Sequence, residues 1–366
     1  MAGMRIGFDA RAAFLDPRRG FGRVARSLAE ALLESCPGEL VVFVPHGAAV
    51  PSRWYPLAAE IVQLRRPRRA AFLVDGPAWR WTLAGRRLDV IHLPTWGVPP
   101  GLPLPVVATF YDATPFRFPS PPGRWPRRRA RMAIRSLGRA TLVHAISDHA
   151  RSELLATVPI DAAAVRAIWL AAGPPFAPAD RPEPPEHLLF VGGADPHKNL
   201  EVVLAALALP GAESLPPLVL AGPGAIDRAV VEAVAQAGGG ARFRCVPAPD
   251  DESLAALYRR AFAVLVPSRS EGFGLPVLEA MACATPVLAA RAGALPEVAG
   301  DAAVLLDPDR PEAWRDALLE LVRSPQRRVV LGQAGRERAA AFSWRRTAEA
   351  LLELYREASH RRVAAR

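Results

Sequence analysis

Short apolar runs recur along the chain at intervals that leave room for a helix between them. Residues 263–267 (Ala-Val-Leu-Val-Pro) are one example, too short for a buried helix and without the polar alternation of a half-exposed strand. Such runs are typical of parallel strands buried on both faces, which need a crossover segment, usually a helix, to connect them. The pattern therefore predicts an α/β protein with parallel sheets covered by helices. The candidate strands are residues 5–8, 40–44, 90–93, 106–110 and 142–145 in the first half, and 187–192, 218–221, 242–246, 263–266, 287–289 and 303–306 in the second.

A proline-rich segment separates the two halves. From Ala171 to Glu186 the chain reads AAGPPFAPADRPEPPE, which cannot pair as a central strand because proline has no N–H to donate. The 366 residues are enough for two domains, each with its own core. We predict a first domain over residues 1–175, a linker over 176–186, a second domain over 187–345, and a C-terminal helix over 346–366 that packs back towards the first domain.

The most informative segment is SRSEGFGLPVLEAMA, residues 268–282. Its Glu-Gly-Phe-Gly part is predicted to turn the chain, and the part that follows to form a helix. Two glycines let the backbone approach a ligand closely, and the unpaired N–H groups of a helix start can bind phosphate or sugar oxygens. Carboxylates at Glu271 and, two helical turns later, at Glu279 can accept the paired hydroxyls of a sugar or a ribose. The alternative interpretation is a capped strand–turn–helix with a solvated glutamate.

This segment resembles the Glu-x7-Glu motif of retaining GT-B glycosyltransferases of the glycogen-synthase and mannosyltransferase group, known as family 4. The resemblance implies two Rossmann-like α/β domains that face each other across a cleft, with a helical segment at the C-terminus. It implies that Glu279 holds the ribose hydroxyls of a nucleotide sugar and that Glu271 acts on the donor sugar. One departure is Ala284, at a helix exit where the family usually has glycine. The other residues expected to contact the donor in this segment are Ser268, Gly272, Phe273, Gly274 and Leu275.

The only lysine and the only asparagine of the chain are neighbours, Lys198 and Asn199. A composition this rich in alanine, arginine, proline and glycine is typical of a GC-rich genome that avoids both residues, so their presence here indicates a chemical requirement. A compact ammonium beside helix N–H groups suits a pyrophosphate. The surrounding VGGADPHKNL resembles the second motif of the family, whose lysine binds the donor pyrophosphate, and this extends the donor site to Gly193, Lys198 and Asn199. Many relatives have arginine where this chain has Gly193. The candidates to replace that arginine are Arg23, Arg269 and Arg291.

The first half carries weaker signals. The sequence RGFGR, residues 19–23, is predicted to form an anion-binding loop between the first strand and a helix over residues 22–34. Its spacing is not that of a dinucleotide fingerprint, but it resembles the Gly-Ile-Gly-Arg loop that lies over the donor phosphates in the family. That resemblance gives donor contacts to Gly20, Gly22 and Arg23. A plain strand-to-helix turn is the alternative.

Asp112 follows the candidate strand 106–110, at a strand end where open α/β sheets bind ligands. Its segment resembles the family's Thr-Ile-His-Asp segment near the acceptor and the transferred sugar, with Tyr111 in place of histidine. We therefore expect Asp112 to take part in catalysis together with Glu271 and Lys198. Ser147 is predicted to cap a helix. His144 and His149 are predicted to be structural.

Other features narrow the class of function. The sequence lacks the nucleophile-elbow, zinc-peptidase and P-loop motifs, which argues against the usual hydrolases and P-loop NTPases. Cys36, Cys245 and Cys283 are too widely spaced for a disulfide framework or a zinc site. Asp307-Pro308-Asp309 looks like a metal-binding Asp-x-Asp but precedes a helix start at Pro311, which explains it fully. We predict no metal and no cofactor other than the nucleotide-sugar substrate.

The resemblance implies an enzyme that moves a hexose from a nucleotide sugar to a glycan or lipid-linked acceptor with retention of configuration. The His-Lys-Asn-Leu pattern and the Gly-Phe-Gly-Arg loop look most like bacterial mannosyltransferases of polysaccharide assembly, so we favour mannose from GDP-mannose. Two alternatives stay open. One is a sugar-nucleotide epimerase with the same architecture, and the other is a catalytically silent scaffold that only binds its ligand.

The chain is basic, with a formal net charge of +10 and arginine clusters at residues 65–69 and 124–139. An arginine face on a helix in the second cluster would suit anionic lipid head groups, while an ordinary surface helix is an equal alternative. No recognised nucleic-acid motif accompanies the charge, so no nucleic acid is expected. Without an apolar run long enough to span a bilayer or a signal-peptide pattern, we expect a cytoplasmic protein, peripheral on the inner membrane face if that helix binds lipid. The helix would place Ala130, Ala133, Ile134 and Leu137 on one face and Arg128, Arg131, Arg135 and Arg139 on another.

Overall fold

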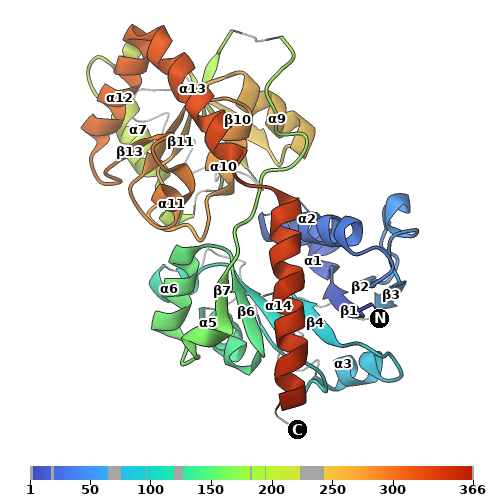
Figure 1. Cartoon of the computed structure of the whole chain (residues 1–366). Coiled ribbons are helices and arrows are strands. Elements are labelled where there is room, and N and C mark those ends of the chain that lie inside the picture. Colours follow the sequence, from blue (N-terminus) through green and yellow to red (C-terminus); the bar gives the residue numbers. More distant parts are fainter. Residues whose placement is uncertain are drawn as a thin grey trace. The chain divides into compact units, whose positions relative to one another are not determined.

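A computed structural model of the chain describes residues 3–17, 20–64, 76–95, 97–118, 127–181, 184–193, 195–222 and 243–364 (Figure 1). The chain divides into two compact units. The first consists of Met1–Leu170 together with Trp344–Arg366, and the second of Ala171–Ser343. The division therefore falls at residue 170 rather than at residue 175, and the proline-rich segment belongs to the second unit.

The first unit is built on a sheet of seven parallel strands. These are β1 (Ile6–Asp9), β2 (Leu40–Pro45), β3 (Glu60–Leu64), β4 (Val90–Leu93), β5 (Val106–Phe110), β6 (Leu142–Ala145) and β7 (Val165–Ala167). Their order across the sheet is β3-β2-β1-β4-β5-β6-β7, and every pairing is parallel. The chain thus winds outwards from β1 in one direction and from β4 in the other, the doubly wound topology in which the carboxyl ends of the strands share one edge.

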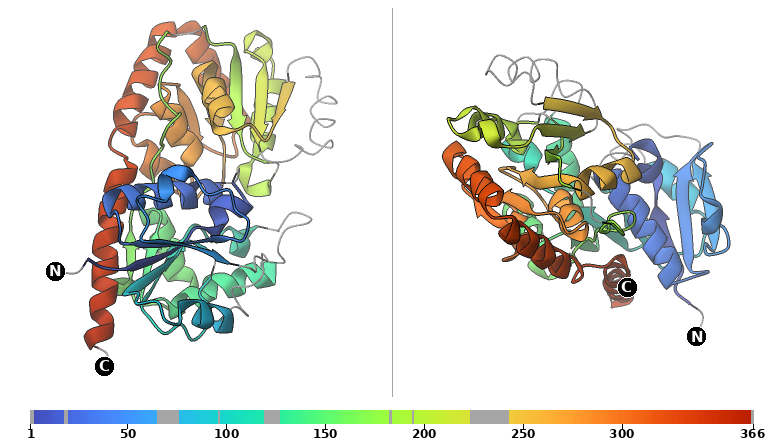
Figure 2. Two further views of the ribbon diagram at one scale, coloured as in Figure 1. Left: turned by 90° about the vertical axis from the view of Figure 1, so that its right-hand side faces the viewer. Right: turned by 90° about the horizontal axis from the view of Figure 1, so that it is seen from above.

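The C-terminal helix closes this unit. It contacts α2 (Gly20–Ser35) and strands β4, β5 and β6, and Figures 1 and 2 show it lying beside this sheet. Its apolar face is buried and includes Leu351, Leu354 and Ala358. The helices of the unit are α1 (Arg11–Leu15), α2 (Gly20–Ser35), α3 (Gly76–Leu83), α4 (Thr114–Arg117), α5 (Arg127–Arg135), α6 (Asp148–Thr157) and α14 (Trp344–Ala364).

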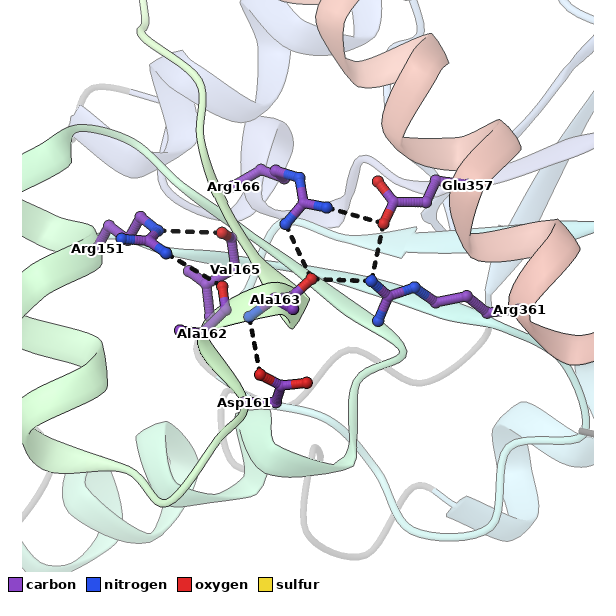
Figure 3. A network of polar contacts seen from close by, with 8 residues as sticks. All are labelled: Arg151, Asp161, Ala162, Ala163, Val165, Arg166, Glu357 and Arg361. Carbon is purple, nitrogen blue, oxygen red and sulfur yellow. Dashed lines mark hydrogen bonds and ion pairs between the residues drawn. The ribbon is translucent and has the colours of Figure 1, made fainter.

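The last turns of α14 also join a surface network beside β7 (Figure 3). A carboxylate oxygen of Glu357 accepts hydrogen bonds from Arg166 (2.9 Å) and Arg361 (2.8 Å). Both arginines also donate to the backbone oxygen of Ala163, each at 2.8 Å. Because these groups are partly exposed, the network adds little stability and mainly fixes where the end of the helix lies.

The second unit has its own parallel sheet with the order β10-β9-β8-β11-β12-β13, again doubly wound. Its strands are β8 (His187–Val191), β9 (Leu218–Gly222), β10 (Phe243–Pro247), β11 (Ala261–Val266), β12 (Val287–Ala290) and β13 (Val304–Leu306). Its helices are α7 (Leu200–Ala208), α9 (Asp251–Arg259), α10 (Leu275–Ala282), α11 (Leu295–Ala299), α12 (Pro311–Arg323) and α13 (Pro325–Ala339).

The structure confirms the predicted parallel α/β architecture of both halves but adds two strands that the sequence did not indicate. β3 contains Glu60 and Gln63 and is only partly buried, while β7 has three residues. Both lie at sheet edges, where one side of the strand meets solvent or a loop. An edge strand therefore lacks the continuous apolar run on which the prediction relied.

A chain of buried polar groups crosses the sheet of the first unit beneath α14. Tyr355 on α14 lies 2.6 Å from His92 Nδ1, and His92 Nε2 lies 2.8 Å from Thr109 Oγ1. Thr109 Oγ1 in turn lies 3.3 Å from His144 Nδ1, and His144 Nε2 lies 2.8 Å from the backbone oxygen of Ile168. The four side chains come from α14, β4, β5 and β6 and are essentially inaccessible to solvent.

The direction of every hydrogen bond in this chain follows from its last acceptor. The Ile168 oxygen can only accept, so His144 Nε2 carries a proton; because burial lowers the pKa of His144 to about 4, the ring is neutral and Nδ1 accepts from Thr109. The Thr109 oxygen must then accept from His92 Nε2. Burial, with a further effect of His144, also lowers the pKa of His92, so its neutral Nδ1 accepts from the Tyr355 hydroxyl. A protonated histidine at either position would add a donor to the chain, so that a neighbouring hydroxyl would have to turn its own proton away.

This arrangement predicts a loss of stability as the pH falls through the range of the histidines. The unfolded histidines bind protons below about pH 6.5, whereas His144 stays neutral down to about 4 in the folded state. The free energy of unfolding should therefore decrease as the pH falls from about 6.5 towards 4, by up to about 3 kcal/mol for His144, and the lowered pKa of His92 acts in the same direction. Urea unfolding at a series of pH values between 7.5 and 4.5 would measure this decrease in the free energy of unfolding.

His144→Gln should remove the part of this decrease that comes from His144, whereas His46→Gln, a change at an exposed histidine, should leave the profile unchanged. Carboxylates whose pKa is lowered, such as Glu271, titrate below their ordinary value and thus below this window. A wild-type profile that stays flat between pH 6.5 and 4.5 would contradict the assignment of neutral histidines.

Candidate active site

The segment that begins at Ser268 lies where the sequence predicted it, at the carboxyl end of a central strand of the second sheet. It follows β11, and Leu275 begins α10. Lys198 lies in the turn after β8, the strand that pairs with β11. The two loops therefore leave neighbouring strands at the same edge of the sheet, and residues 73 positions apart in the sequence meet there.

Lys198 and Glu271 form an ion pair. The Lys198 Nζ lies 2.7 Å from Glu271 Oε1, and the Ser268 hydroxyl donates to the same oxygen at 2.7 Å. The two charged side chains are 19% and 13% exposed, so the pair is shielded but open to solvent at one side. Burial by itself raises the pKa of Glu271, but Lys198, His197 and the Ser268 hydrogen bond outweigh it and hold the pKa below its usual value. Glu271 is thus ionised at neutral pH.

Two glycines shape the backbone around Glu271. Gly274 has a φ of 105° at the start of α10, and a Cβ there would lie 2.8 Å from a methyl carbon of Leu295. Gly293, with a φ of 60°, would place a Cβ 2.7 Å from the backbone nitrogen of Glu271. The sequence predicted Gly274 but missed Gly293, because a close approach between distant segments leaves no local signal. A side chain at position 293 would therefore require the backbone to move, and at position 274 it would require Leu295 to move and a positive φ that favours glycine.

Phe273 and Glu279 are held by residues that the sequence did not single out. The Phe273 ring is buried and packs edge-on against Phe342, with centroids 6.0 Å apart. This contact anchors the turn to the interior of the second unit. Glu279 is 2% exposed, and its Oε2 accepts a hydrogen bond from the Tyr258 hydroxyl at 2.9 Å. Tyr258 belongs to α9, and only the folded chain brings it to α10. Contact of Glu279 with a ribose stays a prediction.

Asn199 is fully buried and ties three loops together. It adopts the left-handed conformation, with φ 54° and ψ 42°, and its Nδ2 donates to the oxygens of Pro267 (3.1 Å) and Pro308 (2.7 Å). These oxygens belong to the loops after β11 and β13. Asn199 therefore supports the site from within the protein, and its contact with the donor stays a prediction.

Of the three predicted substitutes for an arginine at Gly193, Arg23 lies on α2 of the first unit, and the other two are engaged within the second unit. Arg269 pairs with Asp309 through Nη2 at 2.6 Å, and Arg291 donates to the oxygen of Leu305 at 3.2 Å. Asp309 belongs to the turn before α12, which starts at Pro311 as predicted. The structure thus brings Lys198 to Glu271 but brings neither arginine to that pair.

The segment predicted to form a loop up to residue 22 is helical from Gly20 onwards. α2 begins at Gly20, so Gly20, Gly22 and Arg23 form its first turn, and α1 precedes it. A Cβ on Gly22 would lie 2.0 Å from the oxygen of Asp16, so this glycine is required for close packing of α2 against the preceding turn. Contact of Gly20, Gly22 and Arg23 with the donor stays a prediction.

The loop after β5 holds Asp112 in place. Its Oδ1 accepts a hydrogen bond from the backbone nitrogen of Thr114 at 2.8 Å. Tyr111, which stands where the family has histidine, is buried and donates to the oxygen of Pro94 at 3.1 Å. Burial raises the pKa of Tyr111, so its hydroxyl stays protonated. Ser147 caps α6, as predicted, by accepting from the Ala150 nitrogen at 2.8 Å.

Family models match both halves of the chain. The Glycosyltransferase Family 4 model matches residues 18–170 and the "Glycosyl transferases group 1" model matches residues 176–338. O-antigen chain mannosyltransferase B of Escherichia coli is 29% identical over 322 residues, which cover 83% of this chain and 81% of that protein. D-inositol 3-phosphate glycosyltransferase of Rhodococcus opacus (strain B4) is 40% identical over 180 residues, which cover 46% of this chain and only 40% of that protein.

Solved structures with similar folds cover almost the whole chain. Sucrose-phosphate synthase from Thermosynechococcus elongatus has a TM-score of 0.78 and 23% identity, with 97% of this chain and 99% of that chain covered. HepE from Anabaena, solved in complex with UDP-glucose, has a TM-score of 0.73 and 15% identity, with 97% of this chain and all of that chain (100%) covered. At these identities the likeness shows the fold.

The helix that carries Glu279 ends with a residue in an unfavourable conformation. Ala284 has a φ of 58°, its nitrogen donates to the Met281 oxygen at 2.9 Å, and the Thr285 nitrogen donates to the Ala280 oxygen at 2.9 Å. These two bonds form a Schellman motif, in which the left-handed position is usually glycine. The sequence flagged Ala284 as a departure at a helix exit, and the structure shows the backbone conformation that makes glycine the better residue there.

We predict that Ala284→Gly stabilises the protein. The left-handed conformation costs a non-glycine residue about 1–2 kcal/mol, so the free energy of unfolding should rise by about 0.5–1 kcal/mol after the greater chain entropy of glycine is subtracted. Ala282→Gly, two residues earlier inside α10, is the matched control and should destabilise by a similar amount. Chemical denaturation would measure both, and a loss of stability in Ala284→Gly would contradict the prediction.

Proposed function

Because the chain belongs to the GT-B glycosyltransferases of family 4, we propose that it transfers a hexose from a nucleotide sugar to a glycan or lipid-linked acceptor with retention of configuration. The observation that carries this proposal is the Lys198–Glu271 ion pair beside the start of α10. It joins a cation suited to phosphate and a carboxylate suited to sugar hydroxyls at one edge of a sheet.

Each residue then has a chemical role. When the bond to the sugar breaks, negative charge grows on the leaving diphosphate, and Lys198 and the N–H groups at the start of α10 stabilise it. Groups fixed in advance in this way supply about 3–4 kcal/mol for each donor. Glu271 orients the donor sugar and Glu279 the ribose. The leaving phosphate accepts the proton of the acceptor hydroxyl, which attacks from the same face, and Asp112 acts on the acceptor side.

We favour GDP-mannose as the donor. The E. coli relative that matches most of this chain is a mannosyltransferase of the O-antigen chain, which supports mannose and a polysaccharide acceptor. The HepE complex with UDP-glucose supports the broader class of nucleotide sugars for this fold. An epimerase would turn over without an acceptor, and a silent scaffold would bind without turnover, so kinetics with the identified donor separate both from a transferase.

We further propose that α5 contacts an anionic membrane from the cytoplasmic side. Among the described residues no helix is both long and apolar enough to cross a bilayer. Arg131 and Arg139 donate to backbone oxygens of the first unit, whereas the side chains of Arg128 and Arg135 are exposed and make no hydrogen bond or ion pair within the described part of the chain. Met132, 43% exposed, adds an apolar group between them. The cluster at residues 65–69 lies outside the described residues. The predicted apolar face of Ala130, Ala133, Ile134 and Leu137 is buried.

A thermal-shift panel with GDP-mannose, UDP-glucose, UDP-GlcNAc, GDP, UDP and NAD tests the donor proposal. We expect one nucleotide family to raise the melting temperature, because a ligand at about 100 times its Kd adds about 2.7 kcal/mol to the stability. Lys198→Ala should abolish the shift. Arg327→Ala, which removes a cation paired with Glu320 on the surface of the same unit, should retain it. No shift with any sugar nucleotide, or a shift with NAD alone, would contradict the proposal.

Flotation with vesicles tests the membrane proposal. The wild type should float with vesicles that contain anionic lipid, should not float with neutral vesicles, and should be released by salt, because each arginine near an anionic surface contributes about 1 kcal/mol. The double variant Arg128→Gln and Arg135→Gln should lose most of the binding. The control double variant, Arg26→Gln with Arg53→Gln, removes the same charge from other exposed positions of the unit and should keep the binding to anionic vesicles. Equal flotation with neutral vesicles would overturn the idea.

A further inference from the structure

Glu153 is a buried carboxylate to which the proposed mechanism gives no role. It lies on α6 and is 4% exposed. Its Oε2 accepts a hydrogen bond from the backbone nitrogen of Ala113 at 3.2 Å. Its Oε1 lies 2.9 Å from a guanidinium nitrogen of Arg117 and 3.5 Å from His149 Nε2. One carboxylate thus contacts the backbone and a side chain of the segment that follows Asp112.

These contacts keep Glu153 ionised. Burial raises the pKa of the carboxyl group, but His149, Arg117 and the Ala113 N–H together lower it below its usual value. Removing one partner of a buried, hydrogen-bonded charge is costly, because the remaining charge has no access to water. The arrangement therefore persists only while the carboxylate, the Arg117 guanidinium, the His149 ring and the peptide N–H stay together.

The segment that Glu153 contacts has little structure of its own. Residues 112–117 contain only the four-residue helix α4. From the other side, Arg131 of α5 donates to the oxygens of Pro115 (3.2 Å) and Phe116 (3.0 Å) and stacks on the Phe116 ring. Two neighbouring helices thus fix this segment, and Glu153 holds the peptide group next to Asp112.

We propose that Glu153 is a positioning residue that acts through Asp112. Its charge fixes the peptide between Asp112 and Ala113 and the Arg117 side chain, and these contacts set the place of the Asp112 carboxylate at the carboxyl end of β5. The proposal rests on the proposed function, in which Asp112 acts on the acceptor side of the transferred sugar. Glu153 itself contacts neither donor nor acceptor.

A double-mutant cycle of Glu153→Gln and Asp112→Asn tests it. The readout is release of the nucleoside diphosphate from the donor that the thermal-shift panel identifies, with water as acceptor, as kcat and KM for each variant. Glu153→Gln should lower kcat by about 10- to 100-fold, as expected for a small misplacement of a catalytic group, and leave the donor Kd unchanged. In the Asp112→Asn background it should cause no further loss.

Glu357→Gln is the matched control, since it removes a carboxylate paired with two arginines elsewhere in the first unit and should leave kcat unchanged. A Glu153→Gln variant with a lower melting temperature but an unchanged kcat per donor-binding molecule would overturn the proposal. A double variant whose decrease in kcat equals the product of the two single decreases would also overturn it. Hydrogen exchange at the Ala113 amide should be faster in Glu153→Gln, and it needs no donor. If the wild type binds no sugar nucleotide, the proposed function fails, and unchanged exchange would refute the anchoring separately.

Discussion

The carboxamide of Asn199 is the contact on which the geometry of the candidate active site depends. The loops after β8, β11 and β13 leave the same sheet edge, and nothing in the sheet fixes how they lie relative to one another. Asn199 sits in the first loop and donates to a backbone oxygen in each of the other two. Its left-handed backbone is one that asparagine adopts more readily than other non-glycine residues. Because Lys198 and Glu271 lie in two of these loops, this amide and the hydrogen bond from the Arg269 nitrogen to the His197 oxygen (2.8 Å) together hold the segments at which the two side chains meet.

The first unit fixes its own sheet edge with neutral groups. The chain from Tyr355 through His92 and Thr109 to His144 joins three central strands to α14, and each member has one direction of donation. An apolar contact would allow α14 to slide or rotate, whereas this chain is satisfied in one register only. These buried polar contacts thus fix the positions of the strand ends. The loops that carry Asp112 and Ser147 begin at these ends.

The sequence was sufficient to predict the features that depend on local sequence patterns. The parallel sheets, the start of α10, the Ser147 cap and the meeting of the Lys198 and Glu271 segments could all be predicted, because apolar runs and helix starts are local and parallel strands share one edge. What it missed lies in contacts between distant segments. Tyr258 on Glu279, Gly293 against Glu271 and Pro308 on Asn199 leave no trace in spacing. The close approach of Gly22 to Asp16 has the same origin, since a glycine needed for packing looks in the sequence like one needed for a ligand.

The Lys198–Glu271 pair also bears on how a donor would enter the site under the proposed function. An ammonium has three N–H donors, and within the described residues Lys198 uses one of them for Glu271. A diphosphate can therefore bind the remaining donors without breaking the pair. The arriving anion would lie beside a second negative charge, which Ser268 and Lys198 already neutralise in part through hydrogen bonds to the same carboxylate oxygen. A site assembled in this way loses little side-chain freedom on binding, which favours both affinity and a fixed orientation of the leaving group.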